Sequence, residues 1–128
     1  MKKQIPGNLS EGEKEKIVIS QADLMMSPWM RYFLKNDPKD YLRKVKCPVL
    51  AVNGSKDLQV LPEINIDAIK KALAEGGNKR VTTKIFPGLN HLFQHAQTGL
   101  PSEYSQIDET FAPEVLDYVG NWIEKIVK

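Results

Sequence analysis

The sequence predicts an α/β fold with two main parallel strands, because two strand patterns flank one helical pattern. Pro48–Val52 is a continuous apolar run, typical of a strand covered on both faces of a parallel sheet. Val81–Phe86 has the pattern of the next strand. Between them, Pro62 begins a helix that continues to about Glu75 and ends at Gly76. We therefore expect a right-handed βαβ unit with a crossover helix.

A further helix is predicted after this unit. It begins at Pro113, and its apolar residues recur at three- and four-residue steps: Val115, Leu116, Val119, Trp122, Ile123 and Ile126. This spacing indicates a helix that packs one face against the sheet. We expect the chain to divide into a helical leader, residues 1–45, and a βαβα part, residues 46–128.

Local capping patterns predict the helices of the leader. Ser10 and Glu13 match a capping box, which begins a helix ending near Met26. Ser27–Pro28 and Asp37–Pro38 each place proline at the first position of a further short helix. The first third of the chain is therefore expected to be helical.

The composition is that of an ordinary water-soluble domain. The 128 residues carry a net charge of +2, which excludes the strong basic field expected of a nucleic-acid or membrane partner. No window approaches the roughly 18 apolar residues of a membrane span. The basic start Met1–Lys3 is not followed by the apolar run of a signal peptide. We expect a cytoplasmic chain, although a signal on a missing N-terminal part would leave no trace in this sequence.

An acid and a histidine follow the two predicted strands. Asp57 comes just after the turn at Gly54, and His91 comes just after Pro87–Gly88. The carboxyl ends of parallel strands meet at one edge of a sheet, where catalytic groups gather. A carboxylate bound to one imidazole nitrogen fixes the tautomer, so that the other nitrogen can accept a proton. Acid followed by histidine is also the order of the last two members of an α/β-hydrolase triad. Structural roles, a turn cap and a polar loop residue, are the alternative for this pair.

Three segments resemble bacterial α/β-hydrolases of the esterase D-like and prolyl-oligopeptidase-like group. Gly54–Pro62 (GSKDLQVLP) resembles their acid loop, Pro87–Gln94 (PGLNHLFQ) their histidine loop, and Ser27–Pro38 the segment that joins the cap region to the last strands. The resemblance extends from about Ser20 to the final helix. It implies the C-terminal portion of the α/β-hydrolase fold, with Asp57 as the triad acid and His91 as the general base.

The sequence departs from this family at the nucleophile. The family's serine lies on a Gly-x-Ser-x-Gly elbow, and no such motif occurs in the chain. Ser10 is better explained as a helix cap, Ser20 and Ser27 lack flanking glycines, and Ser55 is expected to serve its turn. Cys47 begins the strand that leads to Asp57, so we expect a buried structural thiol at the opposite edge of the sheet.

No cofactor or metal is expected. His91 and His95 have the i, i+4 spacing of a helical zinc pair, and Asp108 or Glu109 would have to complete the site. However, Leu92 stands where a zinc protease has its glutamate. His95 is expected on the surface near the site.

Three aromatic residues of the leader, Trp29, Tyr32 and Phe33, lie at helical spacing. They would line an acyl pocket in a complete enzyme, or pack in an ordinary core. The spacing favours packing.

The expected function follows from what is present and what is missing. We expect a fragment of a serine hydrolase, acting on an acyl ester or a peptide in the complete enzyme, that is inactive alone. The alternative is a non-catalytic interaction module, or one half of a split hydrolase. The apolar strand 48–52 also predicts self-association through an exposed sheet edge.

Overall fold

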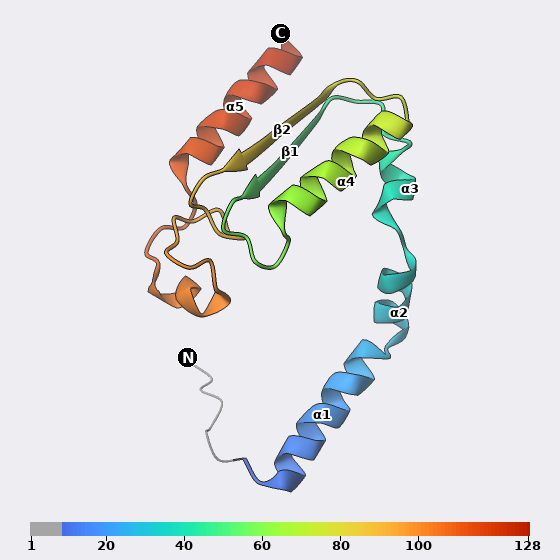
Figure 1. Cartoon of the computed structure of the whole chain (residues 1–128), viewed down its shortest axis with the longest axis vertical. Coiled ribbons are helices and arrows are strands. Elements are labelled where there is room, and N and C mark those ends of the chain that lie inside the picture. Colours follow the sequence, from blue (N-terminus) through green and yellow to red (C-terminus); the bar gives the residue numbers. More distant parts are fainter. Residues whose placement is uncertain (1–8) are drawn as a thin grey trace. The chain divides into compact units, whose positions relative to one another are not determined.

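The structure, a computed structural model, describes residues 9–128 (Figure 1). It contains two compact units, one ending at Asp37 and the other formed by Pro38–Lys128. The segment on which the prediction about a signal peptide rests lies outside the described residues. Within residues 9–128, none of the helices combines the length and the apolar character needed to cross a membrane.

The first unit contains two helices with the predicted caps. Helix α1 (Glu11–Met25) begins with the capping box, in which the Ser10 side chain accepts from the Glu13 amide. Helix α2 (Pro28–Lys35) begins after Ser27, whose side chain accepts from the Met30 amide at 3.2 Å. Both helices are therefore confirmed.

The aromatic residues of α2 do not pack in a core. Trp29 and Phe33 stack on each other with ring centroids 5.5 Å apart. Trp29, Tyr32 and Phe33 are all at least 60% exposed, so the prediction of ordinary packing was wrong for the residues that the structure describes. A helix of only two turns brings these rings together on its own surface and supplies no second layer to cover them.

The second unit is mixed α/β. Its elements are α3 (Pro38–Leu42), β1 (Val49–Gly54), α4 (Pro62–Glu75), β2 (Val81–Phe86), the 3₁₀ helix η1 (Pro101–Gln106) and α5 (Pro113–Val127). Strands β1 and β2 are parallel, in a register that pairs Val49 with Val81 and Gly54 with Phe86. The predicted strand–helix–strand unit and final helix are confirmed. The segment between β2 and α5 contains η1.

The main core lies between the sheet and α5. It comprises Phe86, Leu89, Ala112 and Val115, with Val52, Phe93, Tyr118 and Val119 packed against them. Phe86 meets the rings of Phe93 and Tyr118 edge-on. Helix α4 contacts both strands and buries Ile66, Ala72 and Leu73. Helices α4 and α5 lie on opposite sides of the two strands (Figure 1).

The sheet is less covered than its sequence suggested. Within β1, Val49, Leu50 and Val52 are only half-buried, because the described sheet has two strands and each has one unpaired edge. Cys47 is exposed, so the prediction of a buried thiol was wrong. It precedes the first residue of β1, where the strand has not yet entered the covered part of the sheet.

Candidate active site

The acid loop holds Asp57 in a tight turn just beyond β1. The Asp57 amide donates to the Gly54 carbonyl at 3.2 Å. Its Oδ1 then accepts from the amides of Gln59 at 2.9 Å and Val60 at 2.8 Å. A carboxylate that binds the backbone two and three residues ahead fixes the turn around itself. Asp57 is only 5% exposed.

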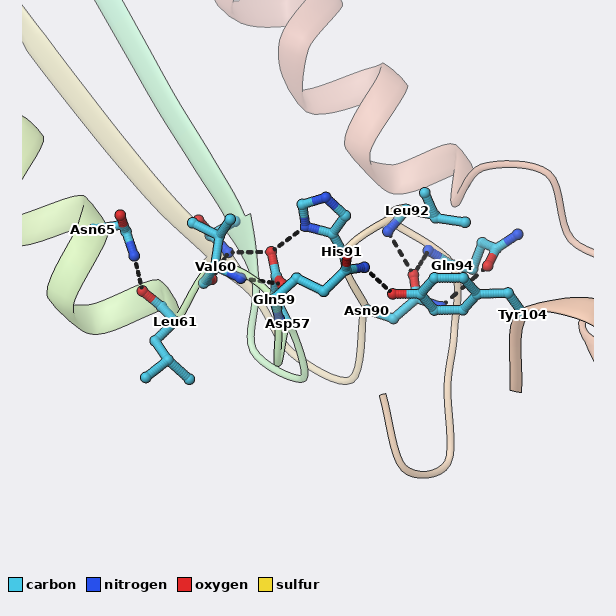
Figure 2. Close-up of polar contacts among 11 residues, drawn as sticks. Asp57, Gln59, Val60, Leu61, Asn65, Asn90, His91, Leu92, Gln94 and Tyr104 are labelled. Atoms are coloured by element: carbon cyan, nitrogen blue, oxygen red, sulfur yellow. Dashed lines mark hydrogen bonds and ion pairs between the residues drawn. The ribbon is translucent and has the colours of Figure 1, made fainter. Parts of the chain in front are cut away.

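The second oxygen of Asp57 faces His91 (Figure 2). The distance from His91 Nδ1 to Asp57 Oδ2 is 2.9 Å. The imidazole is 37% exposed, and Nε2 makes no hydrogen bond to any residue of the second unit, Pro38–Lys128. This is the arrangement that an acid–base pair needs, since the carboxylate binds one nitrogen and leaves the other available.

The surroundings of Asp57 keep it ionised. Burial raises the pKa of this carboxyl, but hydrogen bonds from the Val60 amide, His91 and the Gln59 amide outweigh burial and hold the pKa below the ordinary value. Hydrogen bonds to the charged form favour that form. Asp57 is therefore a carboxylate at neutral pH and can act as a fixed acceptor for the imidazole.

The two loops are joined directly by their backbones. Ser55 N donates to Phe86 O at 2.8 Å, and Lys56 N donates to Leu89 O at 2.8 Å. The Ser55 hydroxyl accepts from Gly88 N at 2.8 Å. Ser55 therefore serves the turn and links the two loops. The parallel register brings both strand ends together, and these bonds hold Asp57 and His91 in contact.

A buried asparagine organises the histidine loop. Asn90 has no exposed surface, and its Oδ1 accepts from the amides of Leu92 at 2.9 Å and Gln94 at 3.0 Å. The loop also contains Phe93 at φ 56°, a left-handed conformation uncommon outside glycine. His91 thus projects from a short turn whose backbone is held on both sides.

His95 has a role that the sequence did not indicate. Its Nδ1 lies 3.0 Å from the Glu109 carboxylate, and its Nε2 lies 3.0 Å from Glu114 in the first turn of α5. The hydrogen bond to Glu109 raises the pKa of His95, and attraction to both carboxylates acts in the same direction against partial desolvation. The imidazolium form can donate from both nitrogens, so His95 bridges the histidine loop to α5.

The two histidines weighed above as zinc ligands, His91 and His95, do not form a metal site with other described residues. Within residues 9–128, no three histidine, cysteine or acidic side chains are grouped so that they could hold a metal ion. His91 and His95 each bind their own carboxylates, Asp57 and Glu109 respectively.

The serines of the leader, which lie in the first unit, have structural roles. Ser10 and Ser27 cap helices, and the Ser20 hydroxyl donates to Ile17 O at 2.9 Å. Cys47 lies before β1 begins and Asp57 after it ends, so the thiol lies at the other end of the strand, as predicted. Within the second unit, residues 38–128, no serine or cysteine forms a hydrogen bond with His91 Nε2.

Two residues of the site were missed by the sequence reasoning, namely Asn53 and Asn90. Both are buried and hydrogen-bonded. The available signal was Asn53 itself, because an amide interrupts an otherwise apolar strand. Asn90 gave no comparable signal, since asparagine is common in turns.

Comparisons of the chain with protein-family models, with curated proteins and with solved structures find no match. The arrangement therefore has to be judged on its own chemistry. It can hold a neutral imidazole in one tautomer and accept a proton at Nε2.

Proposed function

We propose that this chain is the C-terminal part of an α/β-hydrolase and supplies the acid and base of a serine hydrolase triad. The observation that carries the proposal is the 2.9 Å contact between His91 Nδ1 and the buried, ionised Asp57. The resemblance of the two loops to the hydrolase acid and histidine loops supports it. The favoured substrate class is a carboxylic ester, with a peptide as the less favoured one.

The proposed mechanism assigns one step to each side chain. His91 Nε2 takes the proton from a serine hydroxyl as that oxygen attacks the acyl carbon. The same proton then passes from Nε2 to the leaving group. Asp57 stays ionised, holds Nδ1–H and stabilises the imidazolium formed between these steps.

The nucleophile must come from residues outside this sequence. The sequence lacks Gly-x-Ser-x-Gly, and no serine of the second unit, residues 38–128, forms a hydrogen bond with His91 Nε2. Loss of the nucleophile from a triad removes most of the rate enhancement. The 128-residue chain is therefore proposed to be inactive alone.

One half of a split hydrolase is the second candidate. The specific observation in its favour is that β1 has an unpaired edge beside the acid loop, in the part of the chain that the structure describes. A partner strand, from a second chain or a second copy, would satisfy the exposed backbone groups. We accordingly propose self-association through this edge when no other partner is present.

Hydrolysis of a short p-nitrophenyl ester tests the proposal. The assay compares the 128-residue chain with the polypeptide encoded when its reading frame is extended upstream. We expect the extension to contain Gly-x-Ser-x-Gly and the extended protein to hydrolyse the ester. His91→Ala should lower kcat by about 10⁴- to 10⁶-fold, as for other triads.

The matched control is His95→Ala, which removes the other histidine and should leave kcat within about tenfold, because His95 has no part in proton transfer. An extended frame without a serine elbow would refute the fragment proposal. Hydrolysis by the 128-residue chain itself, lost on His91→Ala, would overturn the claim that it is inactive alone. The interaction-module alternative predicts that Asp57→Asn and His91→Ala leave partner binding unchanged.

A further inference from the structure

A buried amide side chain lies behind the acid. Asn53 is the fifth residue of β1 (Val49–Gly54) and is 8% exposed. Its neighbours in the strand, Ala51 and Val52, are apolar. A buried amide is unfavourable unless it is hydrogen-bonded, so the contacts of Asn53 indicate what it does.

Asn53 donates its two amide hydrogens to the acid loop. Its Nδ2 lies 2.9 Å from Asp57 Oδ2 and 3.1 Å from the Val60 carbonyl oxygen. The Val60 amide in turn donates to Asp57 Oδ1. Asn53 therefore closes a small network that contains both the carboxylate and the turn around it.

Asn53 donates to the same oxygen of Asp57 that binds His91. Asp57 Oδ2 accepts from Asn53 Nδ2 and from His91 Nδ1, whereas Oδ1 accepts only from backbone amides. With donors on both oxygens, the carboxylate cannot rotate without breaking several hydrogen bonds. The direction of Oδ2 toward the imidazole is thereby fixed.

We infer that Asn53 is a positioning residue, which holds Asp57 Oδ2 toward His91 Nδ1 and so selects the Nδ1–H tautomer of the imidazole. As a positioning role in catalysis, this rests on the proposed function. As a statement about the Asp57–His91 pair, it stands on the contacts alone. Asn53 contacts the carboxylate of Asp57, not the imidazole of His91. It therefore acts on His91 through Asp57.

The tautomer of His91 provides a direct test on the 128-residue chain. Nitrogen-15 chemical shifts in alkaline buffer distinguish the Nδ1–H from the Nε2–H form. In Asn53→Leu, which keeps similar volume and removes both donors, the ratio of Nδ1–H to Nε2–H tautomer should fall about tenfold, as expected for loss of one hydrogen bond to a charged group. Asn65→Leu, which removes a half-buried amide whose side-chain nitrogen donates to Leu61 O, should leave the ratio unchanged.

A second variant guards against loss of folding. Asn53→Ala removes both donors and adds neither bulk nor charge, so the ratio should fall here as well. An unchanged ratio in either folded variant would overturn the inference. Loss of the native spectrum in both variants would assign Asn53 to holding the fold, and would overturn it equally.

Catalysis adds a separate readout in the extended protein. Asn53→Leu should lower kcat by about 10- to 100-fold with KM within about twofold, because misorientation affects the transition state and not substrate binding. A fall in the tautomer ratio without His91-dependent hydrolysis would refute the hydrolase proposal and leave the role of Asn53 intact. His91-dependent hydrolysis with an unchanged tautomer ratio would refute the role of Asn53 and leave the hydrolase proposal intact.

Discussion

Gly54 lies so close to Leu89 that a Cβ atom added to the glycine would stand 2.3 Å from the Leu89 carbonyl oxygen. The same carbonyl accepts from the Lys56 amide, so the last residue of β1 and the start of the histidine loop are in direct backbone contact. Only glycine permits this approach. The separation of Asp57 and His91 therefore depends on a residue that has no side chain.

Gly54→Ala should lower the free energy of unfolding by about 1–3 kcal/mol, as overpacking does in other proteins. The clash is with backbone, so relief requires one of the two loops to move. Urea denaturation measures the effect. Gly120→Ala is the matched control, because Gly120 lies in α5 with nothing within 4 Å of the added Cβ. That variant should gain about 1 kcal/mol from helix propensity. Equal effects of the two substitutions would contradict the packing argument.

Asn90→Ala should destabilise the histidine loop. The substitution leaves the amides of Leu92 and Gln94 without their acceptor, and an unpaired buried donor, here that of Gln94, costs about 1–3 kcal/mol. Amide hydrogen exchange of residues 91–95 should accelerate more than that of β1. Asn65→Ala removes a half-buried asparagine whose side chain bonds only locally, to Leu61 O, and should change stability by less than about 1 kcal/mol. A result for Asn90→Ala as small as that for Asn65→Ala would show that the loop is held by other bonds.

His95 should make stability depend on pH in the neutral range. Its pKa is raised in the folded state by Glu109 and Glu114, so its stabilising effect is fully present below the unfolded value of 6.5. The effect is lost as pH rises through the raised folded-state pKa. The urea midpoint should therefore fall as the pH rises above 6.5 and through the raised pKa of His95, and should fall less in His95→Gln.

His95→Lys is the control for this titration, because a lysine keeps its charge across that interval. The three proteins differ only at residue 95, so the comparison isolates the effect of His95. A wild-type midpoint that follows the same pH profile as His95→Gln would show that the contacts with Glu109 and Glu114 do not stabilise the fold.

The sequence predicted correctly those features that depend on neighbouring residues or on the order of strands and helices. The Ser10 capping box and the Pro62 helix start depend on residues within one turn, and both were predicted correctly. The meeting of Asp57 and His91 was predictable because parallel strands end at one edge of a sheet. Membership of the α/β-hydrolase fold stays a prediction.

The errors and omissions concern contacts between distant segments. The exposure of Cys47 depends on how far the sheet is covered, which its neighbours in sequence do not determine. The role of His95 depends on Glu109 and Glu114, which lie 14 and 19 positions further along the chain. Asn53 was visible as a polar residue in an apolar strand, but its donation to Asp57 requires the turn that follows.

The open edge of β1 makes self-association testable. Val49 N and Ser55 N both donate to carbonyls of the β2 side, at Arg80 and Phe86. In a parallel ladder alternate residues bond to the same neighbour, so the Leu50 amide points toward the unpaired edge. Leu50→Pro removes that donor without removing a β1–β2 bond.

Sedimentation velocity at tens of micromolar should find associated species for the wild-type chain and a shift toward monomer for Leu50→Pro. Thr83→Pro is the matched control, because by the same alternation its amide points to the outer edge of β2. If β1 is the interface, Thr83→Pro associates like the wild type. Circular dichroism verifies that both variants are folded. A monodisperse wild-type monomer would refute self-association, and a monomeric Thr83→Pro would place the interface on β2 instead.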